Sequence, residues 1–93
     1  MKNTSVEEFI KKLSLPKQKI LSLFFRKRKD ILTRDEIAKG IGKKGRGLGG
    51  ILGGFTQSKI KLLIRVSEDR WIINETYKEE VKRAISKIDK YIW

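Results

Sequence analysis

Apolar residues recur along this chain at two spacings, and the two spacings separate helices from strands. Steps of three and four residues, which place side chains on one face of a helix, predict helices over 5–13, 16–29, 33–41, 46–58 and 76–92. Alternation of apolar and polar residues predicts a strand over 60–66 and a returning strand over 70–73. Ile31-Leu32 is too short for an independent strand and is expected to pair at the edge of a small sheet. The predicted fold class is therefore mainly α with a small β-hairpin (α+β).

Three sequence patterns mark the starts of helices. In a capping box, a Ser or Thr precedes the helix, and a Glu three residues later reaches back to its backbone N–H. The pattern occurs at Ser5–Glu8, Thr33–Glu36 and Thr76–Glu79. Gly40 and Gly42 are expected to end the helix that begins after Thr33.

The helix predicted over 46–58 has two contrasting faces. One face is apolar and carries Leu48, Ile51, Leu52 and Phe55. The opposite face carries Arg46, Gly50, Gly53 and Gln57, so that most of it is bare backbone. Each glycine inside a helix costs about 0.8–1.0 kcal/mol relative to alanine, so several of them together require a reason. We predict that a large partner comes very close to this face.

The charge of the chain indicates the chemistry of that partner. The chain has 23 Lys and Arg against 11 Asp and Glu, and a net charge of +12. Thirteen of the basic and five of the acidic side chains lie in residues 26–70, the segment that holds the glycine-rich helix. A positive field of this kind favours phosphate polymers, so the expected partner is a nucleic acid.

Catalysis is not indicated by the residue types present. Histidine and cysteine are absent, which removes the commonest general base and the thiolate metal ligands. Paired carboxylates lie in the first turns of predicted helices, where negative charge suits the helix dipole. We therefore expect a binding protein that is not an enzyme and has no cofactor, metal or small-molecule ligand. Without a long apolar run or a signal peptide, the expectation is a cytoplasmic protein, associated with the nucleoid if the source is prokaryotic.

Between Pro16 and Ile73 the order of elements resembles the winged helix-turn-helix family. The segments that carry the resemblance are ILTRDEIAKGIG, GRGLGGILGGFTQSK and IKLLIRVSEDRWII. In that family a capped helix leads through a tight turn into a recognition helix, and a two-stranded wing follows. The resemblance implies one domain over 1–93, with a winged-helix core over 16–75 and extra helices over 5–13 and 76–92.

The resemblance also implies a way of binding duplex DNA. The helix that begins at Arg46 would enter the major groove, and the hairpin would lie along the backbone or a minor groove. Glycines replace the usual long polar side chains, which favours backbone approach and shape reading over base readout. The implied function is a small transcriptional regulator or a chromosome-associated protein, with RNA binding still open. The predicted DNA-binding residues are Arg34, Lys43, Lys44, Arg46, Gly50, Gly53, Gln57, Ser58, Lys59, Lys61, Arg65 and Arg70.

An alternative from another class stays open for the same helix. Gly45, Gly49 and Gly53 form a row of small residues, against which a partner helix can pack closely. On this hypothesis the chain is a winged-helix protein-interaction module, and its lysines only keep it soluble.

The last predicted helix is expected to form a homodimer. Its apolar residues follow a heptad-like seam, and the predicted dimerisation residues are Tyr77, Val81, Ala84, Ile85, Ile88, Tyr91 and Ile92. The competing interpretation is a monomer in which this helix folds back onto Phe9, Ile10 and Leu13.

Overall fold

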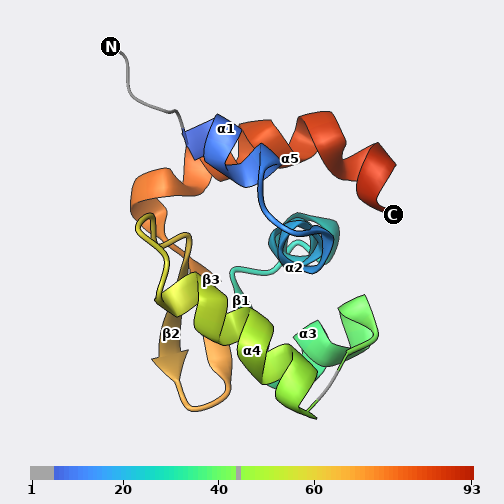
Figure 1. Cartoon of the computed structure of the whole chain (residues 1–93), viewed down its shortest axis with the longest axis vertical. Coiled ribbons are helices and arrows are strands. Elements are labelled where there is room, and N and C mark those ends of the chain that lie inside the picture. The colour runs from blue at the N-terminus through green and yellow to red at the C-terminus, as the bar shows by residue number, and fades with distance from the viewer. Residues whose placement is uncertain (1–5, 44) are drawn as a thin grey trace.

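The structure, a computed structural model, describes residues 6–43 and 45–93. Helices and a small sheet follow one another along the chain (Figure 1). Their bounds are α1 Val6–Lys11, α2 Leu15–Arg26, β1 Ile31–Thr33, α3 Arg34–Ile41, α4 Gly45–Thr56, β2 Leu63–Ser67, β3 Arg70–Ile73, the 3-10 turn η1 Glu75–Tyr77, and α5 Lys78–Ile92. The predicted mainly helical α+β class is confirmed.

The sheet has three antiparallel strands in the order β1-β3-β2. β1 pairs with β3 at one edge, with Leu32 opposite Trp71, as the sequence predicted for this short segment. β2 and β3 form a hairpin, and a bulge lies between Arg65 and Ser67.

The hairpin differs from the prediction in where its first strand begins. The alternation over 60–66 predicted a strand from residue 60, whereas β2 begins at Leu63. Leu62 is also fully buried, so two consecutive side chains enter the core where a regular strand would bury one. The carbonyl of Leu62 accepts the backbone N–H of Asn74 at 2.8 Å, which holds this segment in place. Ile64 is left on the outer face of the sheet, 38% exposed and opposite Ile72.

α2 lies at the centre of the molecule, where Figure 1 shows it end-on with other helices around it. Its five residues from Ile20 to Phe24 are all buried, which an amphipathic surface helix would not allow. The helix contacts α3, α4 and α5. The predicted inward positions Ile20, Leu21 and Phe24 are confirmed, and Phe25 is half-buried at the rim.

The capping box predicted at the start of α3 is confirmed. The Thr33 hydroxyl accepts the backbone N–H of Glu36 at 3.1 Å, and the Glu36 carboxylate accepts the backbone N–H of Thr33 at 3.0 Å. Lys29 donates to the same carboxylate. These bonds satisfy N–H groups that a helix start would otherwise leave without partners.

The two glycines predicted to end α3 have different roles. Gly42 ends the helix as expected, with a left-handed φ of 70°. Gly40 lies inside the helix, so its predicted role as a terminator is wrong. A Cβ built there would lie 2.4 Å from Cδ1 of Leu23, which shows that the glycine allows α2 and α3 to approach closely.

The start of α5 corrects a further prediction. The Thr76–Glu79 pattern does not cap α5, because Asn74 intervenes two residues earlier. The Asn74 side chain accepts the backbone N–H of Thr76 at 3.0 Å and donates to the carbonyl of Lys61 at 2.8 Å. The chain therefore forms the turn η1 first, and α5 begins at Lys78. Ser5, the expected capping residue of the first helix, lies outside the described residues.

The apolar stripe of α5 is buried within the chain itself. Val81, Ala84 and Ile85 are at most 2% exposed, and α5 packs against α1 and α2. Ile92 is 7% exposed, whereas Tyr91 is 76% exposed. The prediction that these residues form an exposed dimer seam is wrong, because most of them are buried where α5 packs against α1 and α2. The competing interpretation, in which α5 folds back onto the N-terminal helix, is the arrangement observed, and homodimer formation stays a prediction without this seam.

A polar cluster joins the end of α5 to α2. Ser22, which is fully buried, donates to Asp89 and accepts the indole N–H of Trp93 at 2.9 Å. Arg26 contacts both oxygens of Asp89, at 2.8 and 3.2 Å, and its guanidinium lies 4.9 Å from the Trp93 ring centre. Burial raises the pKa of Asp89, but the hydrogen bonds from Ser22 and Arg26 outweigh it and leave the pKa lowered.

The close contact at Gly40 predicts opposite effects of the same substitution at two helical glycines. Gly40→Ala should lower the free energy of unfolding by about 1–3 kcal/mol, because Leu23 is packed in the core and cannot move aside freely. Gly50→Ala, which meets nothing within 4 Å, should raise it by up to about 1 kcal/mol. Urea denaturation of both variants measures the difference, and equal effects would contradict the close approach of α2 and α3.

The α3 capping box predicts how the stability of the fold depends on pH. Hydrogen bonds from Lys29 and from the Thr33 backbone lower the pKa of Glu36 to about 2, from 4.5. Because the folded pKa lies below the unfolded value, this contribution is present above the unfolded pKa and is lost as the pH falls towards 2. Glu36→Gln should therefore be less stable than the parent near neutral pH, and thermal unfolding should show the gap narrowing in acid. A gap that stays constant down to the lowest pH would contradict this cause.

Candidate nucleic-acid interface

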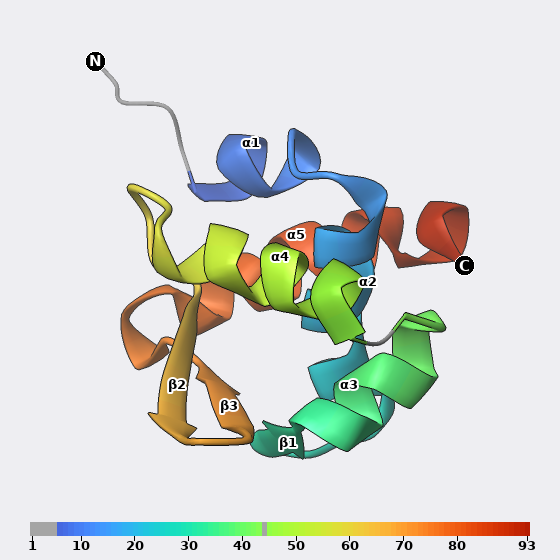
Figure 2. The ribbon, with the colours of Figure 1, turned by 60° about the horizontal axis from the view of Figure 1, so that its bottom comes forward.

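α4 presents bare backbone to the outside. Leu48, Leu52 and Phe55 are buried beneath it, as the apolar spacing predicted. On the other side of the helix, a Cβ built at Gly47, Gly50 or Gly53 would meet nothing within 4 Å. Neither packing nor a left-handed backbone within the described chain therefore explains these glycines. Figure 2 shows α4 crossing the front of the molecule, between the β2–β3 hairpin and α3.

Two other glycines of α4 lie beside cationic side chains, and Gly54 makes room for one of them. A Cβ at Gly49 would lie 3.5 Å from Nη2 of Arg34. A Cβ at Gly54 would lie 2.7 Å from Nζ of Lys17, whose ammonium is 5.8 Å from the centre of the Phe55 ring. The positive charge beside α4 thus comes partly from α2. Lys17 is missing from the predicted set, because its position in the first turn of α2 gives no sign of which helix it faces.

The helix-packing hypothesis for the glycine row finds no partner inside the molecule. Gly45 and Gly53 meet nothing within 4 Å, and Gly49 faces only the Arg34 side chain at that range. Gly45 has a further role, since its φ of 64° is one that side chains rarely adopt. Among the described residues, no helix packs along this row.

The long polar side chains of the α4 segment itself lie only at its two ends. Arg46 lies in the first turn of α4, and Gln57 follows its last residue. At a rise of about 1.5 Å per residue they are separated by about 16 Å along the axis. Both are exposed. Only these two side chains of the segment suit bidentate contacts to base edges. The glycines between them leave the peptide groups of α4 open to close approach.

Arg34 connects the start of α4 to the β2–β3 hairpin. The Arg34 guanidinium donates to the carbonyl of Gly45 at 3.2 Å, and its backbone N–H donates to the carbonyl of Asp69 at 2.7 Å. Asp69 lies in the turn between β2 and β3. The hairpin tip, the first turn of α3 and the start of α4 are thereby held together by one residue.

Two predicted phosphate contacts have structural roles in the fold. Lys61 donates to the carbonyls of Thr56 and Ser58, at 2.6 and 3.4 Å, and so caps the end of α4. Arg65 donates to the carbonyls of Ser67 and Glu68, and its guanidinium lies 5.8 Å from the Trp71 ring centre. These bonds use two of the three N–H groups of Lys61 and only part of the five N–H groups of Arg65, so either side chain could also donate to a phosphate.

The other predicted basic residues in the described chain are exposed, and two of them flank α4 in the sequence. Lys43 precedes the helix, Lys59 follows it, and Arg70 begins β3. Lys44 lies outside the described residues. The structure therefore brings Arg34, Lys43, Arg46 and Lys59 to the ends of one helix, although they lie in two predicted helices and in the segments that follow them.

Among the described residues, no group of acidic side chains is placed to hold a metal ion. No helix within residues 6–43 and 45–93 combines the length and the apolar character needed to cross a membrane.

Comparisons with protein families, curated proteins and solved structures found no match for this chain.

Proposed function

We propose that this protein is a winged-helix DNA-binding protein that binds duplex DNA with the outer face of α4. It acts by binding alone, as a small transcriptional regulator or a chromosome-associated protein. The order of α2, β1, α3, α4 and the β2–β3 hairpin supports the winged-helix assignment, because a capped helix is followed by an exposed helix and a wing.

The observation that carries the proposal is the open space over Gly47, Gly50 and Gly53. Each costs the helix about 1 kcal/mol relative to alanine, and nothing in the described fold offsets that cost. A surface without side chains lets a sugar-phosphate backbone approach the peptide groups directly. Arg46 at one end and Lys59 beyond the other supply charge for the phosphates that come close.

The dimensions and chemistry of α4 favour a B-form duplex. Its 12 residues extend about 18 Å, and a helix with few side chains fits readily into a major groove about 12 Å wide. The major groove of A-form RNA is too narrow for such entry. Since only Arg46 and Gln57 in this segment suit bidentate contacts to base edges, binding should depend on charge and shape more than on sequence.

The protein-interaction alternative predicts a different response to salt. Phosphate binding releases counterions and weakens steeply as salt rises, whereas docking of an apolar helix on the glycines does not. The exposed basic residues at both ends of α4 favour the phosphate partner.

Reversing two charges beside α4 should weaken binding to every duplex. Lys43→Glu with Arg46→Glu should flatten the salt dependence of the binding constant by about one unit of slope per lost phosphate contact. Fluorescence anisotropy with random-sequence duplex DNA at two salt concentrations measures this slope. The matched control, Lys82→Glu with Lys90→Glu on the exposed side of α5, changes the net charge equally. If both double variants lose the same slope, the α4 surface is not the contact.

Adding bulk to the bare face should block binding without unfolding the protein. Gly50→Leu places a side chain in open space and improves helix propensity, so the fold should be retained. Its affinity for duplex DNA should fall about tenfold or more, the cost of losing one close-contact region. Ser86→Leu adds similar bulk at an exposed position of α5 and should bind as the parent does. A folded Gly50→Leu protein with parental affinity would rule out close approach.

A further inference from the structure

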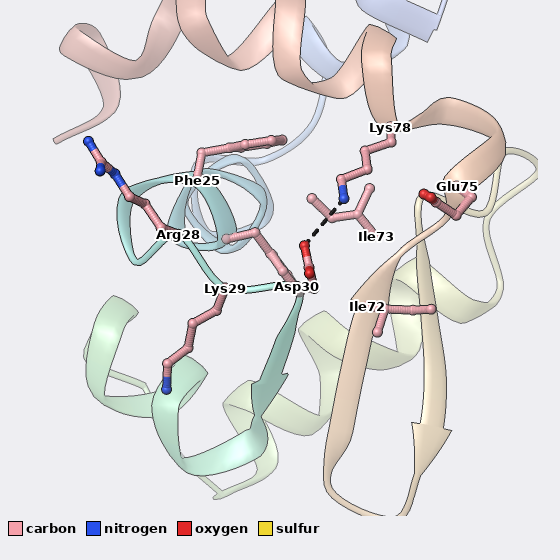
Figure 3. Close-up of a pocket in the computed structure, with 9 residues that line it drawn as sticks. Phe25, Arg28, Lys29, Asp30, Ile72, Ile73, Glu75 and Lys78 are labelled. Carbon is pink, nitrogen blue, oxygen red and sulfur yellow. Dashed lines mark hydrogen bonds and ion pairs between the residues drawn. The ribbon is translucent and has the colours of Figure 1, made fainter.

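A concave surface lies away from the exposed face of α4. A pocket of about 500 Å³ opens between the end of α2, the strand β3 and the start of α5. Figure 3 shows it with α4 behind the strands. Its apolar wall is made by Phe24, Phe25, Ile72 and Ile73. None of the residues that line it belongs to the proposed DNA-binding set.

The apolar wall of the pocket is made by side chains at the edge of the core, two of which are only partly covered. Phe24 and Ile73 are nearly fully buried, whereas Phe25 and Ile72 are half-buried and face the opening. Ile31, opposite Ile72 in the sheet, is 47% exposed and extends the apolar surface beyond the pocket. The volume lies within the range of about 300–1,000 Å³ typical of small-molecule sites.

An ion pair lies across this opening. Nζ of Lys78 is 3.3 Å from Oδ1 of Asp30, which Figure 3 marks with a dashed line. The Asp30 side chain is 90% exposed and that of Lys78 is 42% exposed. A pair this exposed adds little to stability, so another carboxylate can replace Asp30 on Lys78 at little cost. Lys78 is also the first residue of α5, where the helix dipole favours an anion.

The other charged residues around the pocket narrow the choice of ligand. Lys29 is held by Glu36, and Figure 3 shows Arg28 directed away from the opening. Lys78 is then the cation best placed to meet a ligand. Asp30 and Glu75 line the same pocket and would repel a second negative charge.

We propose that this pocket binds a small amphipathic monocarboxylate. Its aromatic or branched body lies against Phe25 and Ile72, and its carboxylate pairs with Lys78 in place of Asp30. This revises the sequence-based expectation of no small-molecule ligand, because the pocket residues come from segments far apart in the chain.

The test compares two compounds with the same apolar body, cinnamate and neutral cinnamyl alcohol. Titrated into the intact protein without nucleic acid, both should give saturable amide shifts centred on Phe25, Ile72 and Lys78. Cinnamate should bind about threefold or more tightly, the size of effect expected for one partly exposed ion pair. Lys78→Met should abolish this preference and leave the affinity for the alcohol within about twofold.

A matched control separates the pocket lysine from the general positive charge. Lys39 forms an equally long pair with Asp35, at 3.3 Å, on the surface of α3. Lys39→Met should keep the preference for cinnamate, and Ile72→Ser should weaken both compounds. The proposal is overturned if neither compound saturates at millimolar concentration, if the shifts spread over the basic surface, or if both lysine variants lose the preference equally. Because no nucleic acid is present, these outcomes do not depend on the DNA-binding proposal.

Discussion

The burial of α2 on every side is the constraint on which the rest of the structure depends. Its residues from Ile20 to Phe24 are all removed from solvent, so α3, α4 and α5 must surround it. Close approach on one side requires Gly40 beside Leu23. On another side, the apolar stripe of α5 is covered by α1 and α2 and is no longer available for a partner. α4 covers α2 with only its apolar stripe, and its glycine face therefore remains outside.

This arrangement divides the surface into two chemically different parts. The α4 face has bare backbone with cations at its ends, and its glycines cost stability that the core must supply. The pocket between α2, β3 and α5 is apolar, with one exposed ion pair across its opening. Docking of α5 defines that pocket, and the Ser22–Asp89–Arg26 cluster fixes the far end of the same helix on α2. The exposed face of α4 and the pocket beside α5 are thus separate candidate sites.

Local signals in the sequence were sufficient for most elements. The Thr33–Glu36 box and the two faces of α4 depend on residues a few positions apart, and the structure confirms them. The open face at Gly50 was also predicted, since it follows from helical spacing alone.

Features that depend on distant segments were not predicted. The stripe of α5 showed which residues are buried but not what covers them, so a dimer seam was expected where α1 packs. Asn74, and not Thr76, begins the turn before α5. Its side chain also donates to the carbonyl of Lys61, on the other side of the hairpin. Lys17 beside Gly54, and the pocket between Phe25 and Lys78, arise only when helices and sheet are packed together.

The most direct test of the central claim is a map of backbone amide shifts during titration with random-sequence duplex DNA. The account predicts the largest changes at Gly47, Gly50 and Gly53, with smaller ones at Arg46 and Arg70, and a weaker response at higher salt. Amides on the exposed side of α5, such as those of Lys82 and Ser86, should not move. Glycine amides that stay unchanged while those of α5 shift would contradict the assignment of α4 as the nucleic-acid contact.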